Sequence, residues 1–194
     1  MGSAVSRMLV TFVLVAITES SHSAQEQDKP VDNDTLAQTV KELQAMAKAD
    51  RGDRLTAQVA LHKKWKDSKQ FQAAIKTIAN GKADVGDAER FFAASLVAGF
   101  GYPSSIGPNS IEGYRLGWYL EWQNVGGSPD YGPEARRFRV EERLKNLQVT
   151  VKPLPGASQT FQEIVWRIIQ DYDLAFELRD GDTFAIKTKP KKAK

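Results

Sequence analysis

Two glutamates near an aromatic cluster are the residues whose types and spacing could do chemistry. Glu112 precedes the cluster, and Glu121 lies within it. The cluster consists of Tyr114, Trp118, Tyr119 and Trp122. Paired carboxylates beside aromatic rings are typical of glycosidases and of sugar-binding platforms. Alternatively, the rings are core, which aromatic residues dominate in small proteins, and the glutamates are solvated. Both interpretations stay open, and we take Glu112, Glu121, Tyr114, Trp118 and Trp122 as candidate binding residues.

Other residue types exclude most kinds of catalytic centre. The chain has no cysteine, which excludes disulfides, thiolate zinc sites and thiol nucleophiles. His62 stands beside Lys63 and Lys64 without an acidic neighbour to orient it as a general base, so we interpret it as a surface residue. No phosphate-binding glycine loop, serine elbow, zinc motif or dinucleotide fingerprint occurs. We therefore expect no catalytic residue, no metal and no cofactor.

The basic character of the chain comes from its C-terminus. The 194 residues are 41% apolar and 26% charged, which is a globular composition. The formal net charge is +3, and it becomes −2 without the five lysines of the last eight residues. We interpret residues 189–194 as a solubilising tail, and we expect no nucleic-acid partner.

Residues 1–24 have the layout of an export signal. Arg7 supplies a positive charge, and residues 8–17 are apolar apart from one threonine. This run is too short for a membrane span, which needs roughly 20 apolar residues. Small residues at 20–24 fit a cleavage site, so we expect the mature chain to start near Gln25 and to be periplasmic or secreted, with no stable membrane span. The alternatives are an uncleaved anchor or a buried N-terminal strand.

A helical unit over 34–100 should follow a flexible leader at 25–33. Hydrophobic spacing predicts four amphipathic helices. They are expected from 34 to about 49, from 54 to 65, from Ser68 as cap to Asn80-Gly81, and from 87 to about 99. In the second helix, Leu55, Val59 and His62 lie on one stripe at helical spacing.

Residues 101–146 are expected to be a glycine- and aromatic-rich segment followed by a charged helix. Within it, residues 110–124 alternate like a strand but also fit a helix capped by Ser110 and closed by Gly126. We favour the helix because both of its ends carry stop signals. The charged helix is expected over 134–146, with a proline just before it.

The pattern from 147 to 188 predicts a β-α-β-β module. Its strands are expected at 148–154, 174–178 and 183–187, and its helix at 161–172. Asp180-Gly181 between two alternating runs is a strong hairpin signal. Phe176 and Phe184, one on each hairpin strand, are further candidate binding residues, because we expect the free edge of this sheet to bind a partner.

The module resembles a known domain family. The matching residues are Val149-Thr-Val151, Thr160 to Ile169 and Leu174 to Ile186. This pattern resembles the short periplasmic domain of secretins, TonB-dependent transducers and FecR-like regulators, which implies a protein–protein docking module without catalysis. The stretch Val149 to Pro153 with Thr160 to Ile164 is also similar to the opening of a LysM peptidoglycan-binding module.

A second resemblance lies upstream. Arg54-Leu, Val59-Ala60, Lys64-Trp65 and Phe91-Phe92 are similar to the core of exported chorismate mutases. That family clamps a dicarboxylate between arginines and lysines of several helices, so the resemblance implies an enzyme. The acidic-Arg segment of the family is missing here, and an all-helical fold conflicts with the β-rich C-terminus.

The expected fold class is α+β, with a helical N-terminal unit and a small C-terminal β-α-β-β module. We expect an exported, non-enzymatic cell-envelope protein that binds another envelope or secreted protein. The partner would be a component of an envelope machine, or a toxin or hydrolase that this protein neutralises. The alternative is a small periplasmic enzyme or a binder of carbohydrate or peptidoglycan, including a divergent exported chorismate mutase.

Overall fold

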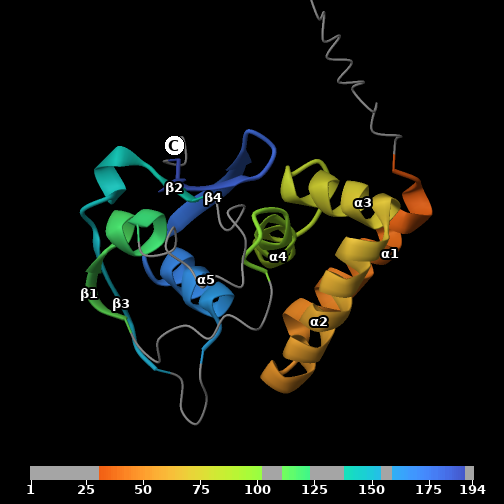
Figure 1. Ribbon diagram of the computed structural model, residues 1–194, viewed down its shortest axis with the longest axis horizontal. Coiled ribbons are helices and arrows are strands. Elements are labelled where there is room, and N and C mark those ends of the chain that lie inside the picture. Colours follow the sequence, from red (N-terminus) through yellow and green to blue (C-terminus); the bar gives the residue numbers. More distant parts are fainter. Residues whose placement is uncertain (1–30, 102–110, 123–137, 154–158, 191–194) are drawn as a thin grey trace, which may run out of the picture.

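The first four helices lie on one side of the structure, and the strands with the last helix lie on the other (Figure 1). The computed structural model describes residues 31–101, 111–122, 138–153 and 159–190. The fold class is α+β, as the sequence predicts. Across these ranges, no helix is long and apolar enough to cross a membrane. The expected export signal at 1–24 lies outside the described residues.

Four helices form the N-terminal unit, close to where the hydrophobic spacing predicts them. They are α1 (Asn33–Lys48), α2 (Arg51–Asp67), α3 (Lys69–Ala79) and α4 (Asp87–Val97). Side-chain oxygens of Asp32, Asp50 and Ser68 cap the first three by accepting hydrogen bonds from backbone N–H groups of the first turn. The Asp50 cap explains why α2 begins earlier than the expected Arg54.

The stripe of Leu55, Val59 and His62 is not the buried face of α2. The buried residues of α2 are Gln58 and Leu61. Val59, the centre of this stripe, is 50% exposed, and Leu55 and His62 beside it are only half-buried. The apolar spacing misleads here because α2 presents a glutamine to the protein interior.

Two sheets lie in the C-terminal half. The larger sheet has the order β2-β5-β4, and the smaller one pairs β1 with β3. Their bounds are β1 (Ile111–Arg115), β2 (Phe138–Val140), β3 (Gln148–Val151), β4 (Leu174–Arg179) and β5 (Thr183–Thr188). β4 is antiparallel to β5, with Arg179 opposite Thr183. Asp180 and Gly181 have φ angles of 52° and 84°, so this turn has the left-handed residues that an Asp-Gly hairpin requires.

The β-α-β-β elements are all present, with α5 (Phe161–Asp171) between β3 and β4. Thr160 and Glu163 form a capping box at the start of α5. β3, however, pairs with β1 and not with the hairpin. The hairpin takes β2 as its third strand, parallel to β5, with Phe138 opposite Phe184. The two strands flanking the module thus come from the segment before it.

The charged helix expected over 134–146 is wrong for the part that the structure describes. Residues 138–140 form β2, and a short 3₁₀ turn follows at Glu142–Leu144. Phe138 and Val140 are buried, and Arg139 between them is exposed. Ion pairs along a solvated helix are worth only a few tenths of a kcal/mol. Burying two large apolar side chains against β5 is worth more.

The helix favoured for 110–124 is wrong at its start. Residues 111–115 form β1, and a short π-helical segment, Trp118–Trp122, follows. Gly113 has a φ of +65°, which a right-handed helix cannot contain. The register with β3 also shifts between Ile111 and Tyr114, as in a β-bulge. The strand alternative is therefore confirmed for this part.

One aromatic core joins the helical unit to the C-terminal module. Phe91 of α4 lies 5.7 Å from Phe176 and 5.8 Å from Phe184, measured between ring centroids, in edge-on contact with both. Phe100 contacts Phe138 at 4.8 Å and Phe184 at 5.0 Å. All five rings are at least 94% buried. Phe161 of α5 contacts Phe138 at 5.7 Å, so the larger sheet packs against both α4 and α5.

Polar pairs fix α2 to α5. Gln58 of α2 donates a hydrogen bond to Gln162 of α5, and Gln162 donates to Ser95 of α4. Gln58, Gln162 and Ser95 are 3%, 3% and 0% exposed. At the start of both helices, Arg51 Nε lies 3.1 Å from Glu163 Oε1. α2 is thus positioned by buried polar contacts as well as by apolar packing.

Candidate functional site

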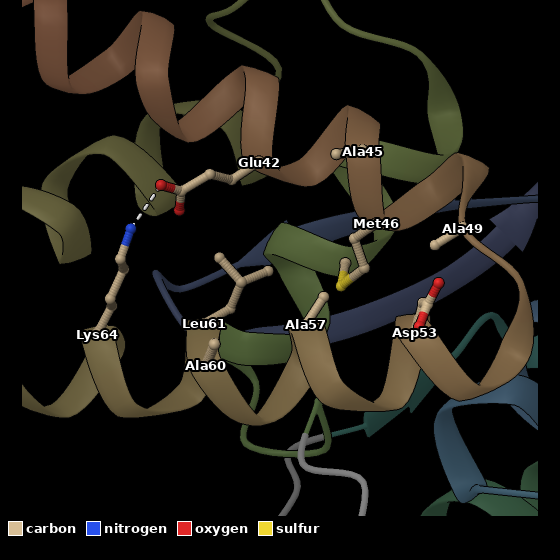
Figure 2. A pocket seen from close by; sticks show the side chains of 9 residues that line it. All are labelled: Glu42, Ala45, Met46, Ala49, Asp53, Ala57, Ala60, Leu61 and Lys64. Atoms are coloured by element: carbon tan, nitrogen blue, oxygen red, sulfur yellow. Dashed lines mark hydrogen bonds and ion pairs between the residues drawn. The ribbon is translucent and has the colours of Figure 1, made fainter.

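A groove runs between α1 and α2, and we call it the α1–α2 groove (Figure 2). Its volume is about 420 Å³, within the range of ligand pockets. It is lined by Glu42, Ala45, Met46 and Ala49 of α1, and by Asp53, Ala57, Ala60, Leu61 and Lys64 of α2. Six of these nine residues are apolar.

Short side chains leave this space between the helices. Met46 and Leu61 are 2% and 4% exposed and form the floor. Four alanines form the walls, and their methyl groups are too small to fill the space between the two helices. The helices meet at their short connection, near Ala49 and Asp53, and at the other end Lys64 Nζ lies 2.5 Å from a carboxylate oxygen of Glu42 (Figure 2). The groove is therefore apolar along its length and charged at both ends.

The groove continues beyond this ion pair. A second depression of about 410 Å³ shares Glu42 and Lys64 with it. Its other lining residues are Asp34, Thr35, Gln38 and Thr39 of α1, with Ser68 and Phe71. An apolar half and a polar half thus lie on either side of one ion pair.

The groove holds few of the residues to which the sequence assigns chemistry. Of the residues of the chorismate mutase resemblance, Ala60 and Lys64 line it, and Lys64 pairs with Glu42. Arg54 does not line it and donates from Nη2 to the carbonyl of Ala49 at 2.9 Å. Burial and the charge of Lys66 lower the pKa of His62, which does not line the groove. Within the described ranges, no cluster of three His, Cys, Asp or Glu residues could hold a metal ion.

A second candidate site is an aromatic shelf, formed by Tyr114 and Trp118. Their rings are stacked, with centroids 5.2 Å apart and planes 5° from parallel. They are 38% and 39% exposed. Beside Trp118 lies a depression of about 340 Å³. It is lined by Arg115, Gly117, Trp118, Glu121, Lys145 and Asn146.

The candidate residues of the aromatic segment have different roles. Glu112 is exposed on β1. Glu121 accepts a hydrogen bond of 2.7 Å from the backbone N–H of Val140 and so covers the outer edge of β2. Trp122 ends the π-helical segment, and its side chain lies outside the described atoms. Tyr114 and Trp118 thus have exposed rings, whereas Glu121 is held by the backbone of β2.

Sequence reasoning missed Lys145 and Asn146 as neighbours of the shelf. They arrive there because the N–H of Gly117 donates to the carbonyl of Lys145 at 3.1 Å. A Cβ at Gly117 would lie 2.9 Å from the Cβ of Lys145, so this close approach requires glycine. Hydrogen bonding to Glu142 and the charge of Glu121 raise the pKa of Lys145. The residues around Gly117 do not predict its contact with Lys145, because the two are far apart in the sequence.

Phe176 and Phe184 are core residues, which corrects their expected role as contacts for a partner. They are 4% and 0% exposed, and their rings stack with centroids 5.4 Å apart. Both point into the core face of the larger sheet. Among the described strands, β4 pairs only with β5, so the outer edge of β4 is an unpaired edge of the larger sheet.

Comparison with known proteins identifies no relative. No protein-family model matches the chain. No curated protein and no solved structure matches it either. The resemblances to the secretin short domain, to LysM modules and to exported chorismate mutases therefore stay predictions.

Proposed function

We propose that this chain is an exported cell-envelope protein that binds another protein, and that the α1–α2 groove receives an apolar helical segment of that partner. The observation that carries the proposal is the groove itself, in which buried Met46 and Leu61 form a floor between alanine walls. An amphipathic helix laid in an apolar groove is a common mode of recognition. Export is inferred from the layout of residues 1–24.

The charges around the groove define the chemistry of the partner segment. Glu42 and Lys64 neutralise one another at one end, and Asp53 adds a negative charge at the other. We expect the bound segment to present two or three large apolar side chains to the floor, with a basic residue near Asp53. The outer edge of β4 is a second surface through which the same partner could extend the contact by strand addition.

The absence of cysteine from the chain makes a site-specific test simple. A single cysteine at Ala60→Cys carries a photoactivatable crosslinker inside the groove, and Val59→Cys carries it on the outside of the same helix. In periplasmic extract, the label at position 60 should crosslink one discrete protein that the label at position 59 does not. Adding Ala57→Glu, which puts a charge into the groove, should abolish that crosslink.

The proposal fails if position 60 yields no crosslinked protein or if both positions yield the same products. Circular dichroism and the thermal midpoint of each variant show that the fold is retained. Export is tested separately by mass spectrometry of the periplasmic fraction, in which the mature chain should begin near Gln25.

A further inference from the structure

The aromatic shelf exposes two large apolar side chains next to one another. Among the described residues, the large hydrophobic side chains that are exposed are Val59, Tyr114 and Trp118. Two of these three stack on one another. Water contact at aromatic rings is unfavourable, and a contiguous exposed patch marks an interaction site more often than a single exposed residue does.

The aromatic shelf packs on buried aromatic rings of the core. Tyr114 contacts the ring of Tyr119 at 6.1 Å, and Tyr119, only 2% exposed, contacts Phe161 of α5 at 6.0 Å. The shelf therefore rests on the core through a chain of rings. Trp118, and not Tyr114, lines the adjacent depression. A ligand that meets Trp118 would find a supported indole and would need little rearrangement of the protein.

The polar groups around the depression balance in charge. Arg115 and Lys145 are the cations that line it, and Glu121 is the anion that lines it. Glu142, a second anion, lies beside it through its ion pair with Lys145. Lys145 Nζ lies 3.0 Å from Glu142 and 3.5 Å from Glu121, so its charge is largely matched within the protein. A phosphate or a nucleic acid would be favoured by unmatched cations. Donors and acceptors in balance, with the amide of Asn146 among them, suit a neutral ligand rich in hydroxyl groups.

We propose that the aromatic shelf is a binding subsite for a neutral β-1,4-linked glycan, with one sugar ring stacked on Trp118. Each pyranose of such a chain has a flat face of C–H groups that packs on an aromatic ring and equatorial hydroxyls that point sideways. Arg115, Glu121, Lys145 and Asn146 line the depression beside Trp118 and offer donors and acceptors to those hydroxyls. This site is independent of the α1–α2 groove.

The test is a titration of the full mature chain with cellohexaose and chitohexaose, and with maltohexaose as the α-1,4-linked control. Binding is followed by the NMR signals of the indole N–H groups. We expect saturable, millimolar binding of a β-1,4-linked hexasaccharide that shifts the Trp118 signal, and weaker binding of maltohexaose. Trp118→Ala should weaken binding about tenfold or more, and Trp118→Tyr should retain most of it.

Val59→Ala, which removes the exposed apolar side chain that lies outside the shelf, is the matched control and should bind like the unaltered chain. The proposal is overturned if neither β-1,4-linked hexasaccharide shifts the Trp118 signal, or if Trp118→Ala keeps its fold and full affinity. Preferential binding of a proline-rich peptide to Trp118 would also overturn it. Trp118→Ala could lose binding only because it is less stable, so Trp118→Tyr is measured beside it. If Trp118→Tyr is folded and fails to bind, the proposal is contradicted as well.

Discussion

Replacing Gln162 with leucine should lower the free energy of unfolding by about 2–4 kcal/mol. Gln162 is 3% exposed, accepts a hydrogen bond from Gln58 and donates one to Ser95. Each lost bond between neutral groups is worth about 1 kcal/mol, and the buried amide of Gln58 would lose its partner at a further cost of about 1–3 kcal/mol. The apolar surface of leucine offsets part of this loss.

Gln58→Leu should destabilise less than Gln162→Leu. The Nε2 of Gln58 donates to Gln162, but its Oε1 has no hydrogen-bond partner in the described part of the chain. Removing this side chain therefore relieves one unsatisfied atom while it breaks one bond. The loss of unfolding free energy in the double variant should be about 1–2 kcal/mol smaller than the sum of the losses in the two single variants. In the double variant, no buried amide is left without its hydrogen-bond partner.

Urea unfolding followed by tryptophan fluorescence measures these differences. With a typical slope of about 2 kcal/mol per molar urea, Gln162→Leu should lower the midpoint by about 1–2 M. If Gln162→Leu costs less than about 0.5 kcal/mol, or if the double variant equals the sum of the singles, the buried pair does not fix α2 to α5.

Three further changes test the fold. Phe184→Ala should cost about 3–5 kcal/mol in urea unfolding, because its fully buried ring contacts the aromatic core, and a cost below 1 kcal/mol would contradict that packing. Gly113→Ala should cost about 1–2 kcal/mol through its φ of +65°, and an unchanged midpoint would refute the strain. Lys187 and Arg179 lower the pKa of Glu177 below its usual 4.5, so its stabilisation is present above pH 4.5 and is lost as the pH falls through the lowered pKa. Glu177→Gln should therefore cost well under 1 kcal/mol at pH 7 and less at pH 3, and equal losses at both values would argue against the ion pair.

Local signals predict the helices and the hairpin because the residues that form them are neighbours in the chain. Ser68 and Thr160 each cap the helix that follows, and a cap needs only the next three residues. Asp180 and Gly181 adopt the positive φ angles that these residue types tolerate in turns. The positions of these elements, and the α+β class, follow from such short-range rules.

Long-range pairing explains what the sequence did not predict. Phe138 to Val140 joins β5, a strand more than forty residues later, and this pairing overrides a local preference for a charged helix. The pattern on α2 fails for a related reason, since Gln58 faces inward to meet Gln162 of a distant helix. The residues next to Phe138 and Gln58 in the sequence do not indicate that these residues contact β5 and Gln162.

Of the two candidate sites, the aromatic shelf could be predicted from the sequence and the α1–α2 groove could not. Tyr114 and Trp118 could be chosen from the sequence because aromatic residues stand out, and they are exposed and stacked. The α1–α2 groove could not, because it is made by the absence of bulk at alanines such as Ala57 and Ala60. Only the pairing of two helices shows that these methyl groups face one space.

The most direct measurement of the central claim is the rate at which a maleimide labels Ala60→Cys, compared in the intact cell envelope and in purified protein. Val59→Cys on the outside of α2 serves as the reference. If a partner segment lies in the α1–α2 groove, labelling at position 60 should slow about tenfold or more in the envelope while position 59 changes little. Equal labelling of position 60 in both settings would show an empty groove and would contradict the account.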